Sequence, residues 1–201
     1  MAEPQNPMEV LWRRLAAESA QAVAERAAVA LEADAGAFII PLCGQRLRVL
    51  PAARRIECPD GPCGFEATLL GLNYLLGAKD DPPAGELVNP RTLPLGDFFF
   101  RGPHDLPTGM LEAAFGLRLS AFRRAAEAIG GRALAAGDAA YEFQALPRVP
   151  VTVILWTADE EFPARVQFLL DQKADRQLPL DSLWLLCLVL AKRLAAIGGK
   201  G

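Results

Sequence analysis

Apolar residues recur with a helical spacing in several segments of the chain. Residues 8–33 are rich in alanine and carry larger apolar side chains three to four residues apart, which predicts one long amphipathic helix. Residues 64–76 repeat this spacing and stop before Gly77, a typical residue at a helix C-terminus. The other predicted helices are two short ones capped by Thr108 and Ser120, and two at 163–171 and 180–197.

Other segments carry the signals of antiparallel strands. Two apolar runs in residues 37–51 flank Gly44, which predicts a hairpin with this glycine in its turn. Gly137-Asp138 marks a second hairpin, which is followed by a further apolar run. The strands predicted in this region are 132–136, 139–145 and 150–156. The last of them is apolar on both faces, as is typical of a central strand covered by helices.

Together these elements predict the α+β class and a single domain. A mostly antiparallel sheet, built from the N-terminal hairpin and the 132–156 meander, would be covered by helices. The Ala-rich helix would occupy residues 1–34, ahead of a main domain of residues 35–201. Residues 78–107 carry six prolines and the triplet Phe98–Phe100. A loop this long is usually functional, and we expect at least one of the three phenylalanines to cover a pocket or an interface.

Composition and charge narrow the class of protein. The chain has 201 residues, of which 52% are hydrophobic and 22% charged, as in an ordinary globular domain. Its net charge of −3 argues against a nucleic-acid partner, because phosphate binding requires a basic surface. The longest apolar run, 183–191, is far shorter than the roughly 20 residues of a membrane span. The first residues also lack a signal-peptide pattern. We therefore expect a cytoplasmic protein whose four cysteines are mostly unbridged.

Several motifs resemble the DUF3786 family, an uncharacterised family of bacteria and archaea. The most specific is W-x-x-D-E-E-F-P at 156–163, followed by L-x-D at 169–171. The wider matching segments are NYLLGA (73–78), GELVNPRTLP (85–94), FRGPH (100–104), residues 130–171 and LPLDSLWLL (178–186). The resemblance implies a soluble cytoplasmic protein near the cofactor metabolism of anaerobes, where some members are joined to iron–sulphur or corrinoid-associated modules. It carries no catalytic residue over to this chain.

Three consecutive carboxylates, Asp159–Glu161, lie between the apolar strand that ends at Trp156 and the helix predicted from Pro163. A structural role is the simpler interpretation, because acidic residues are favoured at a helix N-terminus. The helix would account for one or two of the charges, since adjacent carboxylates repel one another. A bound cation, a basic partner or an arginine such as Arg101 or Arg148 would compensate the rest.

His104 is the only histidine and lies in the motif FRGPHDLP. An imidazole titrates near neutral pH and can act as an acid, a base or an axial ligand. The rigid proline and glycine frame and the neighbouring aromatic residues favour a functional role. The simpler interpretation is a loop histidine hydrogen-bonded to a backbone carbonyl or to water.

Four cysteines allow several interpretations. Cys58 and Cys63, with Cys43 and His104, could supply the Cys₃His ligand set of a structural zinc site. Cys58 and Cys63 could also form a disulfide or a redox pair. The simplest interpretation is that they are ordinary cysteines beside the Pro-Asp-Gly-Pro turn. Cys63 lies at the start of a predicted helix, where the dipole would stabilise its thiolate. Cys187, within an apolar run, is predicted to be buried in the core.

Three functional hypotheses follow. The first is a binding or accessory protein that holds a small organic ligand or cofactor between His104, Arg101, Phe100, Trp156, Asp159 and Glu161. The second is an enzyme that uses His104 with Asp159, Glu160 or Glu161 for acid/base chemistry. The third is an interaction module whose acidic edge docks a basic protein, and the Ala-rich helix could support a homodimer. The sequence has no dinucleotide, phosphate-loop, zincin or hydrolase motif, so it identifies no cofactor.

Overall fold

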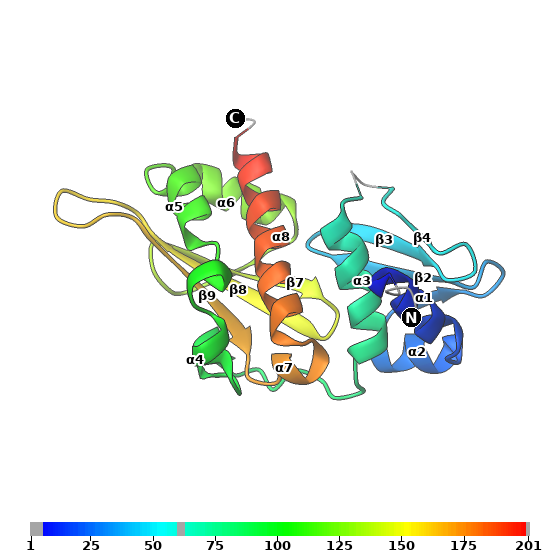
Figure 1. Ribbon diagram of the computed structural model, residues 1–201. Coiled ribbons are helices and arrows are strands. Elements are labelled where there is room, and N and C mark those ends of the chain that lie inside the picture. The colour runs from blue at the N-terminus through cyan, green and yellow to red at the C-terminus, as the bar shows by residue number, and fades with distance from the viewer. Residues whose placement is uncertain (1–5, 60–62, 200–201) are drawn as a thin grey trace.

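The computed structural model describes residues 6–59 and 63–199 (Figure 1). Its helices are α1 (Pro7–Ala16), α2 (Ala20–Ala27), α3 (Phe65–Gly77), η1 (Pro90–Thr92), α4 (Gly96–Phe99), η2 (Gly102–His104), α5 (Thr108–Phe115), α6 (Leu119–Ala128), α7 (Ala174–Gln177) and α8 (Leu180–Gly198). Its strands are β1 (Ala30–Glu32), β2 (Ala37–Leu42), β3 (Gln45–Leu50), β4 (Arg55–Glu57), β5 (Leu87–Val88), β6 (Arg132–Leu134), β7 (Ala139–Leu146), β8 (Val149–Trp156) and β9 (Arg165–Asp171). The α+β class and the antiparallel pairing are confirmed.

The predicted hairpin and meander belong to two separate antiparallel sheets. The first has the strand order β1-β2-β3-β4, and the second has the order β5-β9-β8-β7-β6. The β2–β3 turn consists of Cys43 and Gly44, which both have positive φ angles of 47° and 74°. This is the backbone conformation that a two-residue hairpin turn requires. The first hairpin is therefore confirmed, with Gly44 in its turn as predicted.

The second sheet confirms the meander and shows a strand where a helix was predicted. Strand β8 lies between β7 and β9, and all its residues except Trp156 are buried, so it is the predicted central strand. The helix predicted at 163–171 is wrong, because residues 165–171 form β9. The buried side chains of Val166, Phe168 and Leu170 alternate with more exposed neighbours, which is the two-residue period of a strand.

The single long helix predicted over residues 8–33 is also wrong, because this segment forms α1, α2 and β1. Helix α1 ends at Ala16. Ser19 then caps α2 by accepting a hydrogen bond from the Ala22 N–H at 3.5 Å. Ala28 then adopts a left-handed conformation with φ of 52°, which ends α2 and turns the chain into β1. An alanine can adopt this conformation at some cost. The sequence therefore has no glycine or proline that would mark the end of α2.

Two smaller predictions also need correction. Pro107 and Arg118, rather than Thr108 and Ser120, occupy the N-cap positions of α5 and α6, and neither makes a side-chain capping bond. Phe65, which the helical spacing of residues 64–76 places among the inward-facing apolar residues, is instead 66% exposed at the start of α3. Of the predicted Pro-Asp-Gly-Pro turn, residues 60–62 lie outside the described residues.

The two sheets share one apolar core, so the described elements pack as a unit. Helices α5 and α8 lie across one face of the second sheet, and α3 lies between α8 and the first sheet (Figure 1). The turn of the first sheet docks on the second, where the Cys43 N–H donates to the Ala145 carbonyl at 3.0 Å. From α8, Arg193 donates to the Gln45 side chain and the Gly44 carbonyl of the same turn. Within the described residues, no helix has both the length and the apolar character needed to cross a bilayer.

Candidate binding site at the base of the β8–β9 hairpin

The three consecutive carboxylates lie in a hairpin loop that extends away from the body of the molecule (Figure 1). Strands β8 and β9 pair up to Trp156 and Arg165, and the loop of residues 157–164 continues beyond them. Asp159, Glu160 and Glu161 are all exposed. With β9 in place of the predicted helix, no helix dipole stabilises these charges. Solvent does so instead.

Hydrogen bonds from the backbone shape the loop. The Asp159 carboxylate accepts from the N–H groups of Glu161 and Phe162 at 2.9 and 2.7 Å. Neither arginine considered as a partner for the carboxylates is paired with them. Arg101 forms an ion pair with Asp97, and Arg148 pairs with Asp80 at 2.6 Å. Neither Arg101 nor Arg148 therefore compensates the charges of the acidic loop.

A cavity of about 570 Å³ lies at the base of this hairpin, and we call it the Trp156 cavity. It is lined by Asp138, Trp156, Thr157, Asp159, Phe162, Pro163, Ala164 and Arg165. Half of these residues present apolar surface, and Phe162 is 65% exposed at the edge. The combination of aromatic walls and a few polar groups is typical of sites for small molecules.

Arg165 is the cationic group of this cavity. Its guanidinium carbon lies 5.0 Å from the centroid of the Trp156 ring, which is a cation–π contact. Antiparallel pairing places the two residues opposite each other on β8 and β9. Within residues 6–59 and 63–199, no carboxylate forms an ion pair with Arg165. Its charge is therefore available to a ligand.

The two carboxylates in the cavity wall are occupied by other donors. Asp159 accepts the loop N–H groups described above, and Asp138 accepts from the N–H and the hydroxyl of Thr157 at 2.7 and 2.6 Å. These bonds from Thr157 hold the pKa of Asp138 below its ordinary value, since they stabilise the charged form. Asp138 therefore fixes the base of the hairpin and stays ionised at neutral pH.

His104 lies in a different cluster. Its ring stacks on Phe99 with centroids 4.4 Å apart, and it meets the Trp184 ring edge-on at 5.7 Å. The Trp184 indole N–H donates to the Asp105 carbonyl at 3.0 Å, which anchors the loop to α8. Phe100 is fully buried and packs edge-on against Phe99. Neither His104 nor Phe100 lines the Trp156 cavity.

The structure thus divides the predicted site residues between two places. Trp156 and Asp159 line one cavity, Glu160 and Glu161 lie in the exposed loop beyond it, and His104 lies with the aromatic residues of the 98–104 segment. In the triplet, Phe98 is exposed and Phe100 is buried. Cover of a pocket or an interface by one of these rings stays a prediction. The residues Arg165, Asp138 and Phe162 were missed. A hairpin register would have found Arg165, because it pairs with Trp156.

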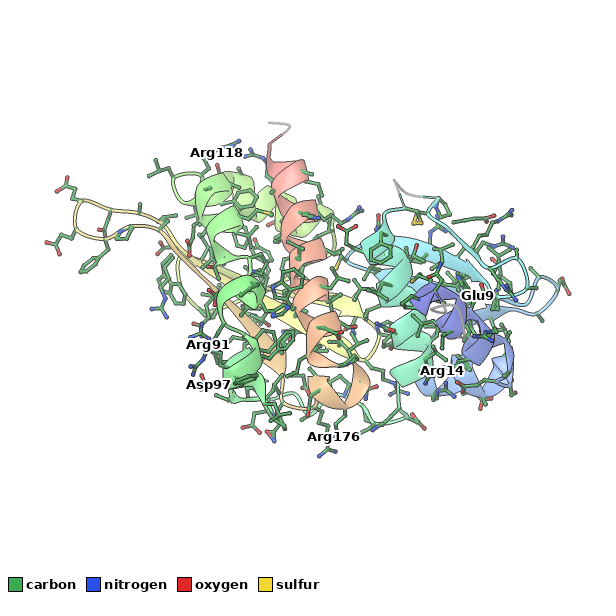
Figure 2. The ribbon with its side chains drawn as sticks, viewed as in Figure 1. Glu9, Arg14, Arg91, Asp97, Arg118 and Arg176 are labelled. Atoms are coloured by element: carbon green, nitrogen blue, oxygen red, sulfur yellow. A yellow bond between two sulfur atoms is a disulfide. The ribbon has the colours of Figure 1, made fainter. Side chains whose placement is uncertain are left out.

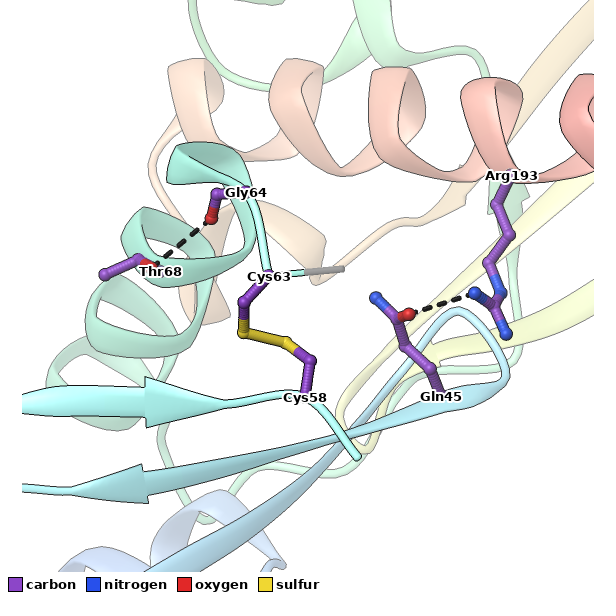
Figure 3. Close-up of a disulfide and its surroundings, with 6 residues drawn as sticks. All are labelled: Gln45, Cys58, Cys63, Gly64, Thr68 and Arg193. Atoms are coloured by element: carbon purple, nitrogen blue, oxygen red, sulfur yellow. Dashed lines mark hydrogen bonds between the residues drawn. A yellow bond between two sulfur atoms is a disulfide. The ribbon is translucent and has the colours of Figure 1, made fainter. Parts of the chain in front are cut away.

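The cysteines do not assemble the predicted zinc ligand set. Cys58 and Cys63 form a disulfide with a Cα–Cα distance of 5.3 Å, which joins the end of β4 to the residue before Gly64, the N-cap of α3 (Figure 3). The expectation of unbridged thiols is therefore wrong for this pair. Cys43 is buried in the β2–β3 turn, and burial raises the pKa of its thiol to about 12. Cys187 is buried in the core, as predicted. Among the described residues, no group of three or more histidine, cysteine, aspartate or glutamate side chains could hold a metal ion.

Comparison with protein-family models gives one match of high coverage. The model described as "Domain of unknown function (DUF3786)" matches residues 19–193 of the chain. No curated protein and no solved structure matches the chain.

Proposed function

The chain belongs to the DUF3786 family, and we propose that it binds a small organic molecule with a flat apolar part in the Trp156 cavity. It acts in this proposal as a ligand- or cofactor-binding accessory protein of anaerobic metabolism in the cytoplasm. The observation that carries the proposal is the cavity itself, whose volume of about 570 Å³ lies within the range of small-molecule sites.

Trp156 supports this proposal because its position is unusual for its strand. All other residues of β8 are buried, whereas the Trp156 ring is half-exposed at the cavity wall. An indole ring offers a flat apolar surface at little conformational cost. Arg165 already lies over part of this ring, so the cationic group is in place before a ligand arrives.

The enzyme hypothesis has less support. The ring contacts of His104 are to Phe99 and Trp184, and within the described part of the chain its imidazole forms no hydrogen bond with a carboxylate. The hypothesis requires His104 and one of the carboxylates Asp159–Glu161 to act on the same substrate, so the two groups would have to lie near each other. The proposal therefore does not use His104, whose exposed ring contacts Phe99 and Trp184.

The proposal is tested with phenylnaphthylamine, a neutral aromatic dye that fluoresces when it enters an apolar site. We expect the wild-type protein to bind the dye, and Trp156→Ala to weaken binding at least about tenfold, because removing an aromatic wall costs on the order of 1.4 kcal/mol. The matched control is Trp184→Ala, which removes another half-exposed tryptophan from the His104 cluster. No binding by the wild-type protein, or equal binding by Trp156→Ala, would reject the proposal.

A second candidate function is protein binding by the hairpin loop. The loop extends away from the body of the molecule (Figure 1). Glu160, Glu161 and the neighbouring Phe162 are exposed in it. Its partner in this proposal is a protein with a basic surface and an apolar recess for that ring, since opposite charges steer association. Replacing both glutamates by glutamine should abolish capture of such a partner and leave the Asp159 turn intact. If this variant captures the partner at low salt as well as the wild type does, protein binding through the acidic residues of the loop is excluded.

A further inference from the structure

Arg165 also lines a second cavity, which we call the polar cavity. It has a volume of about 460 Å³. Its polar lining consists of Asn89, Arg91, Asp105, Thr108, Arg165 and Gln167. These residues come from η1 and its N-cap, from the loop before α5 and the first residue of that helix, and from the start of β9. Arg165 lines both cavities, so the Trp156 cavity and the polar cavity share this residue.

The polar cavity carries an excess of positive charge. Arg91 pairs with Asp105 at 3.2 Å, while Arg165 has no carboxylate partner among the described residues. Two guanidinium groups against one carboxylate leave one net positive charge. Glu112 on α5 is close by, but its carboxylate accepts the Val166 N–H at 3.0 Å, on the edge of β9. That bond gives Glu112 a structural partner of its own.

Arg91 is held in place by the surrounding backbone. Its Nε donates to the Phe100 carbonyl at 3.1 Å, and its own N–H donates to the Asn89 side chain at 3.0 Å. Figure 2 shows Arg91 close to α4, on the side of the molecule from which the hairpin extends. A fixed guanidinium is well suited to bind an anionic oxygen group, because it presents several donors in one plane.

We propose that the polar cavity binds the anionic group of the same molecule whose flat apolar part occupies the Trp156 cavity. This inference rests on the proposed function and names the ligand class: an aromatic or similarly flat anion. Arg165 contacts both parts of the ligand, with its guanidinium over the apolar ring system and its N–H donors toward the anionic oxygens. Arg91 supplies the second cation, while Asn89, Thr108 and Gln167 supply neutral polar groups.

Two dyes with the same ring system test the inference. Anilinonaphthalene sulfonate is phenylnaphthylamine with an added sulfonate, so the difference in their affinities isolates the contribution of the anionic group. At physiological salt we expect the wild-type protein to bind the sulfonate dye at least about tenfold more tightly, since hydrogen bonds to charged groups are the stronger ones. Near-ultraviolet circular dichroism confirms that each protein is folded, because the sulfonate dye also binds loosened states.

Arg91→Gln should remove most of the preference for the sulfonate dye and leave the affinity for phenylnaphthylamine unchanged, because Arg91 lines only the polar cavity. Arg91→Lys should retain part of the preference, since it keeps the charge. The matched control is Arg101→Gln, which removes an exposed arginine of the same region that lines neither cavity. This control should behave as the wild type.

The outcomes separate the inference from the proposed function. Equal affinity of the wild type for the two dyes, with phenylnaphthylamine still dependent on Trp156, overturns the inference and leaves the proposed function standing. An unchanged preference in folded Arg91→Gln also overturns the inference. If neither dye binds the wild type, both proposals fail.

Discussion

The two ends of β9 use charged residues in opposite ways. At one end, Asp171 is 1% exposed, and its carboxylate accepts three backbone N–H groups, from Ala84, Gly85 and Lys173, at 2.8–3.0 Å. At the other end, Arg165 is exposed beside two cavities and forms no ion pair with the described residues. One charge is saturated by the protein, and the other is left for a ligand.

This difference shows how a charged residue can be assigned to structure or to binding. A buried carboxylate is tolerable only when donors replace its lost water, and Asp171 obtains them by fixing the 84–86 segment against the strand. A cation at a cavity wall keeps its water until a ligand displaces it. The number of internal partners, rather than the charge itself, distinguishes the two roles.

The largest effect on stability should come from removing the buried carboxylate at the Asp171 end of β9. We expect Asp171→Ala to lower the free energy of unfolding by about 3 kcal/mol, because it leaves three N–H groups without their acceptor in a buried place. Urea denaturation measures this loss. The matched control is Asp159→Ala, which removes a carboxylate that also accepts two backbone N–H groups, but in the exposed loop. Water can replace that acceptor, so equal losses in the two variants would contradict the comparison.

A smaller effect on stability is expected at the hairpin end. Arg165→Gln should change the free energy of unfolding by less than about 1 kcal/mol, since cation–π contacts at exposed sites are worth about that much or less. The same substitution should weaken binding of anilinonaphthalene sulfonate about tenfold or more. Urea denaturation and dye titration of one preparation compare the two quantities. A large loss of stability with unchanged dye binding would make Arg165 a structural residue like Asp171.

The smallest effect concerns pH at the base of the hairpin. Because Thr157 holds the folded-state pKa of Asp138 below the value in the unfolded chain, ionised Asp138 stabilises the fold. This contribution is present above the unfolded pKa and is lost as the pH falls through the lowered folded pKa. Thr157→Val removes the hydroxyl bond but keeps the N–H bond, so it should raise the pKa of Asp138 part of the way toward its ordinary value. Carbon-13 NMR titration of the Asp138 carboxyl group measures this, and an unchanged or lower pKa would contradict it.

Much of the fold could be predicted from the sequence, in the segments where the spacing of apolar residues and the flanking turn residues indicate the same element. The β2–β3 hairpin, α3, the central strand β8 and α8 were all predicted close to their observed bounds. In each, the apolar spacing and the flanking turn residues favour the same element.

The prediction failed where two local signals competed. Before residue 165, three acidic residues and Pro163 resemble the start of a helix, and this signal obscured the alternation of Val166, Phe168 and Leu170. The strand forms because β8 offers an apolar partner along its whole length, which no local pattern records. Because of the same error, the acidic residues were predicted at a helix N-terminus, whereas they lie in a hairpin loop.

The site was predicted only in part for the same reason. Trp156 and Asp159 were chosen from the sequence and share a cavity, whereas Arg165 became visible only once β9 was paired with β8. His104 was chosen for its chemistry, but Phe99 and Trp184 determine its surroundings. Contacts between segments far apart in the chain decided both outcomes.

The most direct measurement is the NMR spectrum of the tryptophan indole N–H groups during titration with phenylnaphthylamine. The chain has three tryptophans, so each reports on its own surroundings. We expect the Trp156 signal to shift progressively with dye, while the signals of Trp12 in the core and Trp184 beside His104 stay unchanged. A shift of the Trp184 signal without one at Trp156 would contradict binding at the base of the hairpin.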